Sequence, residues 1–365
     1  MHATQIEEVI GDFLHLKKRG ANLLGLCPFH DEKTPSFTVS PSKEIFKCFG
    51  CGKAGNSVAF IMEHEQFTYP EALRYLAAKY NIEIEETRSE VALEQQTQRE
   101  SLHIVLAGAQ KYFADLMKED GEGKDVGLAY FKERRLSTAT LQDFGLGWSP
   151  TGRDTFTQWA LKSGYQREYI VNTGLAIETE SGVLLDRFRE RVMFPIYNLT
   201  GKVIGFGGRI VRSNAKEAKY INSPETEVYN KSTALYGLSQ AKKVLRQQDS
   251  CILVEGYMDV LTMYQAGITN VVASSGTSLT EDQLRLIKRF TNNLTLFFDG
   301  DDAGRKAAMR AIDMALSQEM NVKIALLPKE EDPDTFTRDK GTDEIRRYLT
   351  ENAFGFIQFK TQYLL

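Results

Sequence analysis

The stretch CILVEGYMDVLTMYQAGITNVVASSG, residues 251–276, decides the fold class of the larger part of this chain. It begins with a short apolar run, continues with a segment of helical periodicity, and ends in a second apolar run. Near-continuous apolar strands that alternate with helices are typical of a parallel sheet covered by helices. The stretch therefore predicts a strand–helix–strand unit of the α/β class.

The same alternation continues toward the end of the chain. Thr280 and Gln283 form a predicted capping box at the start of the next helix. Cys251, at the start of the first strand, is most simply a buried core thiol. Two further strands are expected at LTLFFDG and VKIALLP, with a helix between them at GRKAAMRAIDMAL.

Acidic side chains follow these strands, at the sheet edge where ligands bind in open α/β sheets. Glu255 ends the first strand, Asp299 and Asp301 follow the third, and Asp332 and Asp334 follow the fourth. Two carboxylates about 4 Å apart repel by roughly 4 kcal/mol at an effective dielectric of about 20. Oxygen ligands from several strand ends suit Mg²⁺ or Mn²⁺, which would offset this repulsion. The pattern predicts a divalent-metal site that can support nucleotidyl or phosphoryl chemistry.

A structural alternative stays open for the DGDD stretch. It is also compatible with a polar loop in which one aspartate caps the next helix, and Asp302 is the candidate for that role.

The first fifty residues contain a second metal motif. Cys27 and His30 are separated by two residues, as are Cys48 and Cys51. Three thiolates and one imidazole form a closed tetrahedral shell for one structural Zn²⁺, and the flanking TPSFTVSP and KEIFKCF segments favour the strands of a zinc ribbon. The alternatives are chance clustering and a redox pair.

Cations and aromatic residues interleave around this ribbon. A set of this kind suits single-stranded nucleic acid, although each phenylalanine could equally belong to the ribbon's own core. The residues concerned are Lys43, Lys47, Lys53, Phe37, Phe46 and Phe49.

The middle of the chain is basic although the whole chain carries a net charge of −4. Residues 183–246 hold 12 Lys and Arg against 5 Asp and Glu. Such a patch is the electrostatic footprint of a phosphate-binding surface, and the alternative is an ordinary solvated surface. The cations that stand out are Arg187, Arg189, Arg191, Arg209, Lys219 and Lys231. GFGGR does not complete a dinucleotide fingerprint, and GCGKAGNS does not have Walker A spacing.

The composition and the motifs together predict how the chain divides into domains. We expect a multidomain α/β protein in the cytoplasm, because no secretory signal and no membrane-length apolar run is evident. The predicted parts are a zinc-ribbon domain, a linker, a mixed α+β basic subdomain, an α/β parallel-sheet subdomain and the start of a helical segment, at residues 1–85, 86–103, 104–245, 246–340 and 341–365.

Together these motifs resemble bacterial DnaG-type primases. VEGYMDV with DGDDAG is similar to the Toprim signature, and the CPFH…CxxC ribbon is similar to the zinc domain of that family. RFRERVMFPI, GFGGR, KYINSPET and EDPDTF resemble stretches of its polymerase domain, and the similarity runs to about residue 340. The family continues into a helicase-binding domain, whereas this chain stops at FKTQYLL, so we expect that domain to be missing.

The resemblance implies a DNA-dependent RNA polymerase that makes short RNA primers from ribonucleoside triphosphates on single-stranded DNA, with a replicative helicase as partner of the full-length protein. By position, Glu255, Asp299 and Asp301 would be catalytic and bind the divalent metal, and Asp332 and Asp334 would help hold a second ion. The zinc ribbon would help select the initiation site. Template and nucleotide contacts would come from Arg134, Arg187, Arg189, Arg209, Lys219 and Lys231.

Three other classes of protein share some of these motifs. A Toprim nuclease would use the same carboxylates to cut a strand. A topoisomerase needs a tyrosine nucleophile on further domains, for which 365 residues leave little room. A non-catalytic zinc-containing DNA-binding module would not need the strand-end acids.

Overall fold

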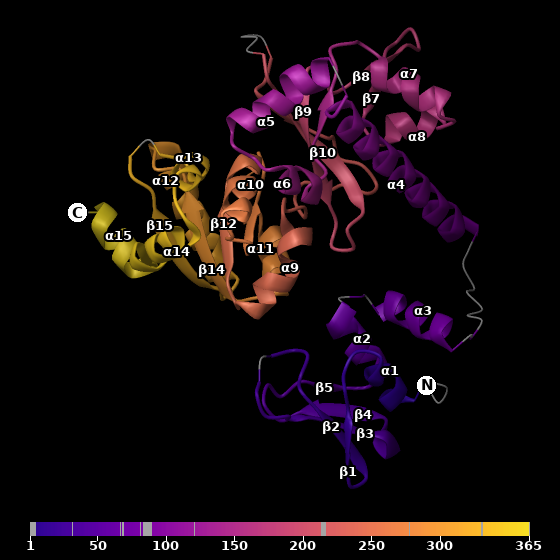
Figure 1. Cartoon of the computed structure of the whole chain (residues 1–365), viewed down its shortest axis with the longest axis vertical. Coiled ribbons are helices and arrows are strands. Elements are labelled where there is room, and N and C mark those ends of the chain that lie inside the picture. The colour runs from indigo at the N-terminus through magenta and orange to yellow at the C-terminus, as the bar shows by residue number, and fades with distance from the viewer. Residues whose placement is uncertain are drawn as a thin grey trace. The chain divides into compact units, whose positions relative to one another are not determined.

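The structure is a computed structural model of the chain. It describes residues 5–30, 32–65, 67, 69–80, 82, 90–119, 121–212, 217–276, 278–329 and 331–364. The chain divides into two compact units, Met1–Ser89 and Glu90–Leu365, and each is described by itself (Figure 1). In the described part of the chain, no helix is long and apolar enough to cross a bilayer.

The amino-terminal unit is an antiparallel sheet with helices packed on one face. Its strands follow the order β1-β2-β3-β4-β5. Strict alternation in β3 and β4 buries Phe37, Val39, Phe46 and Cys48. The strands predicted for the ribbon are confirmed, and two helices follow them. The elements are α1 (Ile6–Gly11), β1 (Lys17–Arg19), β2 (Asn22–Gly25), β3 (Phe37–Ser40), the 3-10 turn η1 (Pro41–Lys43), β4 (Ile45–Cys48), β5 (Ala54–Gly55), α2 (Ser57–Glu65) and α3 (Tyr69–Lys79).

The first half of the carboxyl-terminal unit is built on an antiparallel sheet of order β11-β10-β9-β6 with the long helix α4 against it. Strands β9 and β10 form an antiparallel hairpin with its turn at residues 198–201. The elements are α4 (Glu90–Leu116), the π-helix η2 (Gly123–Leu128), α5 (Ala129–Glu133), α6 (Thr138–Asp143), β6 (Gly147–Ser149), α7 (Thr155–Lys162), α8 (Arg167–Asn172), β7 (Ala176–Glu178), β8 (Leu184–Asp186), β9 (Arg191–Tyr197), β10 (Val203–Ile210) and β11 (Tyr220–Asn222).

The glycines of GFGGR serve close packing. A Cβ on Gly207 would lie 2.3 Å from the ring of Tyr257, so only glycine lets β10 approach that ring. This contact joins the basic subdomain to the α/β subdomain, because Tyr257 starts α10.

The second half is a sheet of order β13-β12-β14-β15-β16, in which the first four strands are parallel, as predicted (Figure 1). Alternate residues of each strand point to opposite faces of the sheet, so their side chains pack into two separate hydrophobic cores. Helices α10, α13 and α14 pack on one face, and α9, α11, α12 and α15 on the other. The elements are α9 (Leu238–Gln247), β12 (Cys251–Val254), α10 (Tyr257–Gln265), β13 (Val271–Ala273), α11 (Glu281–Lys288), β14 (Asn293–Phe298), α12 (Asp302–Ser317), β15 (Asn321–Leu326), α13 (Pro333–Arg338), α14 (Thr342–Glu351), β16 (Ala353–Gly355) and α15 (Phe356–Leu364).

Several local predictions are confirmed in this subdomain. Cys251 is fully buried in the sheet. The side chain of Thr280 accepts a hydrogen bond from Gln283 N–H, and Thr280 N–H donates one to Gln283 Oε1, which completes the expected capping box.

Two predicted boundaries differ from the structure. Of the linker predicted at 86–103, residues 86–89 lie outside the described residues, and the rest is the first half of α4, whose Leu102 is fully buried. At the other end, β16 adds an antiparallel edge strand to the sheet, so part of 341–365 completes the α/β subdomain. Both differences arise because a long-range contact, invisible in the local pattern, holds the segment.

Candidate active site and metal centre

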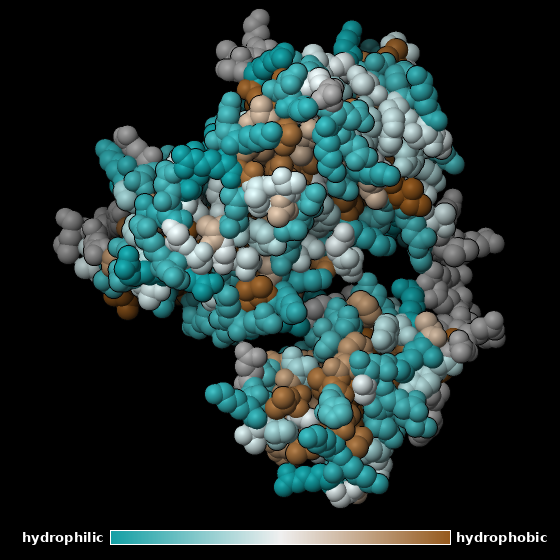
Figure 2. Space-filling model, viewed as in Figure 1, coloured by the Kyte–Doolittle hydropathy of each residue, from teal (hydrophilic) through white to brown (hydrophobic). Residues whose placement is uncertain are grey.

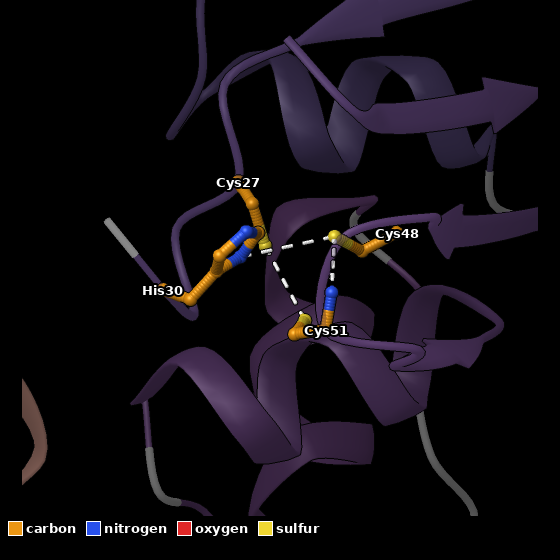
Figure 3. A group of neighbouring side chains, drawn as sticks. All are labelled: Cys27, His30, Cys48 and Cys51. Carbon is orange, nitrogen blue, oxygen red and sulfur yellow. Dashed lines mark hydrogen bonds between the residues drawn. The ribbon is translucent and has the colours of Figure 1, made fainter. Parts of the chain in front are cut away.

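The four predicted zinc ligands converge in the amino-terminal unit (Figure 3). Their ligand atoms all lie within 4.8 Å of one another. The Sγ atoms of Cys27 and Cys51 are 3.8 Å apart, and Cys48 Sγ lies 3.8 Å from His30 Nδ1. A tetrahedral shell with Zn–S bonds of about 2.3 Å requires edges of roughly 3.8 Å. The cluster therefore fits one structural zinc ion.

Neighbouring groups orient this cluster. Glu32 accepts hydrogen bonds from the backbone N–H groups of Cys27 and Ser36, at 2.8 and 2.9 Å. Its carboxylate also lies 3.3 Å from His30 Nε2, which leaves Nδ1 for the metal. Burial opposes ionisation of Cys48, but N–H and O–H donors from Cys51 and Ser36 lower its thiol pKa to about 7. At Cys48 the chain thus favours the thiolate that zinc binds, whereas burial raises the pKa of the Cys27 thiol to about 12, so that thiol loses its proton to the metal.

A cavity of about 580 Å³ opens at the carboxyl ends of the parallel strands. Glu255, Asp299, Asp332 and Asp334 line it, as the sequence predicts, and Arg134, Arg209 and Lys219 line it from the basic subdomain. Asp301 does not line the cavity, but its charge acts on both Glu255 and Asp299. Acids and cations far apart in sequence therefore meet in one place.

The acids of this cavity are crowded and partly dehydrated. Burial, followed by repulsion from Glu255, Asp332 and Asp301, raises the pKa of Asp299 to about 7. Burial raises the pKa of Glu255 in the same direction, although Asp299 N–H donates a 3.4 Å hydrogen bond to its Oε1. Both carboxylates are costly to ionise without a cation, which is the electrostatic signature of a metal site.

The structure assigns helix capping differently from the sequence. Asp301, not Asp302, is the N-cap of α12, and its side chain accepts a 2.7 Å hydrogen bond from Gly304 N–H. A Cβ on Gly304 would lie 2.3 Å from the carbonyl oxygen of Asp299, so glycine is required there. The Asp302 side chain is 91% exposed, and within the described ranges its ion pair is with Arg305 alone. Asp332 likewise caps α13 through Thr335 N–H.

Asp334 has cationic partners that the sequence does not reveal. It is 3% exposed, and its Oδ2 accepts hydrogen bonds from Arg134 and, at 2.9 Å, from Arg338. Its Oδ1 is buried without a hydrogen-bond partner. The pair with Arg134 ties α5 of the basic subdomain to α13 of the α/β subdomain, so both residues orient each other in the cavity wall.

The predicted cations divide into those that line the acidic cavity and those that do not. Arg134, Arg209 and Lys219 form the first group. The guanidinium of Arg209 stacks between Tyr130 and Tyr220, with ring centroids 4.5 and 5.8 Å away. Arg187, Arg189 and Lys231 are not among the residues that line the acidic cavity. Arg191, singled out in the sequence, is buried and donates to the carbonyl oxygens of Gly208, Ala218 and Lys219, so its role is structural.

Asp259, Arg310 and Tyr220 also line the cavity but were missed. Asp259 accepts a 2.8 Å hydrogen bond from Gly256 N–H, and burial together with repulsion from Asp299 raises its pKa to about 8. A signal was present: Asp259 lies in the first turn after Glu255 and therefore stays at the same edge of the sheet.

Three family models match successive parts of the chain. They are described as CHC2 zinc finger at residues 1–92, DNA primase catalytic core, N-terminal domain at 112–242, and Toprim-like at 252–337. Their order follows the ribbon, the basic subdomain and the α/β subdomain.

Curated relatives match nearly the whole chain. A DNA primase of Clostridium acetobutylicum is 39% identical over 355 residues, which cover 97% of this chain and 58% of the relative. One of Pseudomonas aeruginosa is 38% identical over 371 residues, which cover 100% of this chain and 55% of the relative. The chain thus spans less than three fifths of the length of these relatives.

Solved structures have the same architecture. The zinc-binding and RNA polymerase domains of Aquifex aeolicus primase match with a TM-score of 0.66 and 36% identity, over 98% of this chain and 85% of that one. A DnaG primase catalytic domain bound to single-stranded DNA matches with a TM-score of 0.66 and 35% identity, over 74% and 84% of the two chains. With its zinc ribbon, basic core and strand-end acids in matching order, the chain belongs to the DnaG-type primase family.

Proposed function

We propose that this chain is a DNA-dependent RNA polymerase that makes short RNA primers on single-stranded DNA. The observation that carries the proposal is the cavity in which strand-end carboxylates face cations of the basic subdomain. Such a site can hold a nucleoside triphosphate with its metal and place it against a growing strand. The activity and partners of the longer relatives extend to this chain only as part of this proposal.

The acids fit divalent metal. Glu255, Asp299 and Asp301 would hold the catalytic ion, and Asp332 with the free Oδ1 of Asp334 would help hold a second one. The raised pKa values of Asp299 and Glu255 support this assignment, because a nearby cation removes the repulsion that raises them. When bound, the ions activate the attacking 3′-hydroxyl and neutralise the leaving pyrophosphate. Asp259 lines the same cavity with a pKa of about 8, and a cation bound nearby would favour its ionised form.

The cations complete the site. Arg209 is held by two tyrosine faces and Arg134 by Asp334, so both guanidinium groups are oriented before substrate binds. Lys219 lies beside Arg209 on the same cavity wall. These side chains would bind the triphosphate and the template backbone. Because binding requires a defined geometry, their fixed orientation matters more than the number of positive charges.

We expect the stability of the metal-free protein to fall as pH rises from about 4 to 7. In this window folded Asp299 keeps a proton that the unfolded chain releases, because its pKa is about 7 in the folded chain against about 3.9 unfolded. In EDTA, Asp299→Asn should therefore raise the melting temperature, by about 2 °C or more at pH 8 and by less at pH 5. Thermal melts of both proteins check this. An equal effect at both pH values would contradict the assigned pKa.

The outer face of the amino-terminal sheet is a candidate template surface. The pairing register of strands β1 to β4 places the side chains of Lys17, Arg19 and Lys47 on the face of the sheet that points away from the hydrophobic core. Phe37 and Phe46 belong to the core, whereas Phe49 is 70% exposed with Lys47 Nζ 5.3 Å from its ring centroid. Figure 2 shows hydrophobic residues among hydrophilic ones on the visible face of this unit. Cations beside an exposed ring support a single-stranded DNA contact.

Phe49→Ala should weaken binding of single-stranded DNA by about fivefold or more, because stacking of one base contributes about 1–3 kcal/mol. Lys47→Ala should lower the slope of log affinity against log salt by roughly 0.7. Ile45→Ala is the matched control, since Ile45 is an exposed, non-aromatic residue of the same strand. Fluorescence anisotropy with labelled DNA measures all three, and an equal loss in Ile45→Ala would exclude stacking by Phe49.

The proposed function is tested on a denaturing gel with end-labelled single-stranded DNA, ribonucleotides that carry a second, distinguishable label, and Mg²⁺ or Mn²⁺. We expect short labelled RNAs that require template and disappear with EDTA. A Toprim nuclease would instead shorten the DNA and produce no RNA, and that result would overturn the proposal.

A further inference from the structure

A second cavity, of about 540 Å³, lies at the opposite end of the parallel strands. Ile252, Thr295 and Lys323 lie side by side in its wall, on β12, β14 and β15. Helix α14 contributes three further lining residues, Arg346, Leu349 and Thr350. Asp299, just past the end of β14, lies four positions after Thr295, which corresponds to roughly 13 Å of extended chain. The two cavities therefore open at different edges of one sheet.

The charge of this second cavity is positive. Lys323 and Arg346 are its charged lining residues, and no acid lines it in the described part of the chain. The Lys323 ammonium has no hydrogen bond or ion pair to any described residue, and the Arg346 side chain donates only to Gly267 O, at 3.4 Å. Two cations from different elements, both without a carboxylate partner, suit an anionic ligand.

The remaining wall suits a ring that carries polar groups. Asn270 is buried and donates both amide hydrogens to Ser250, to the carbonyl oxygen at 3.1 Å and to the hydroxyl at 2.9 Å. Its amide oxygen is thereby left as an acceptor. Ile252, Ile268 and Leu349 supply apolar surface next to it. Small-molecule sites commonly combine such apolar walls with a few fixed polar groups in volumes of about 300–1,000 Å³.

We propose that this cavity binds a nucleotide as an effector and not as a polymerisation substrate. Its phosphates lie between Lys323 and Arg346, and its base lies on the apolar wall with an exocyclic amine toward Asn270. The inference does not rest on the polymerase activity, because it uses none of the residues of the acidic cavity.

The experiment uses the full chain in EDTA, which weakens metal-dependent nucleotide binding at the acidic cavity, with ADP as the probe. Titration calorimetry should give at least tenfold weaker ADP binding for Lys323→Ala and for Arg346→Ala. Arg347→Ala is the matched control, since Arg347 is an exposed neighbour on α14 that does not line the cavity, and its affinity should stay within twofold.

Photo-crosslinking of the unaltered chain with 8-azido-ADP gives a readout independent of any variant's folding. The labelled peptides should come from β15 or α14. Absence of ADP binding, equal affinity in all three variants, or labelling only of peptides that contain Arg209 or Lys219 would each overturn the proposal. RNA synthesis by Lys323→Ala at saturating ribonucleotides should stay within twofold of the unaltered chain.

Discussion

Asp299→Asn should reduce RNA synthesis by on the order of 10²- to 10³-fold while binding of single-stranded DNA stays within twofold. The change removes one negative oxygen from the wall of the acidic cavity and leaves the size of the side chain almost unchanged. Since Glu255, Asp301 and Asp332 all lie close enough to repel Asp299, its loss should weaken the site for every divalent ion held there. Gel quantification of labelled RNA and anisotropy with labelled DNA measure the two properties separately.

Asp302→Asn is the control for this prediction. Asp302 is the first residue of α12, three positions after Asp299, and undergoes the same chemical change. Its side chain is 91% exposed, and among the described residues it pairs with Arg305 alone. Its RNA synthesis should stay within about twofold of the unaltered chain. If both variants lost activity equally, the general charge of the loop, and not a metal site, would explain the effect.

Cys48→Ala should release the zinc and unfold the amino-terminal unit. The thiolate is one of the four ligands of the cluster, and metal binding in ribbons of this size contributes apparent folding energy on the order of 10 kcal/mol. His30→Ala should act in the same way, whereas His15→Ala, at an exposed position outside the cluster, should not. Atomic absorption should give one zinc per unaltered chain and almost none for the two ligand variants.

Limited proteolysis locates the unfolding. Cleavage should appear within residues 5–80 of the ligand variants, and residues 90–364 should stay protected as in the unaltered chain. Retained zinc in Cys48→Ala, or protection of both units, would contradict a structural metal centre.

The sequence predicts those parts of the fold in which a local pattern has one structural solution. The apolar runs of β12, β14 and β15 alternate with helices. In the ribbon, two residues separate Cys27 from His30 and two separate Cys48 from Cys51, a spacing that suits tetrahedral zinc. Both motifs are confirmed. The acids at strand ends follow from the same logic, since the carboxyl ends of parallel strands share one edge.

Other features depend on contacts between distant residues. The ion pair of Arg134 with Asp334 spans 200 positions, so no local pattern reveals that each holds the other. Residues 90–103 are polar, but the helix they form is anchored by packing from Leu102 onward. The choice of Asp301 over Asp302 as the cap depends on where the backbone leaves β14, which is a difference of one residue.

Addition of a single ribonucleotide to a labelled RNA annealed to a DNA template tests the central claim most directly, because it isolates nucleotidyl transfer from initiation. With Mg²⁺ or Mn²⁺ and the one ribonucleotide that pairs with the next template base, the account predicts that the labelled RNA lengthens by one nucleotide, and that Asp299→Asn largely abolishes this product. A labelled RNA that is shortened, or one that stays unchanged while the protein binds the hybrid and metal, would contradict the account.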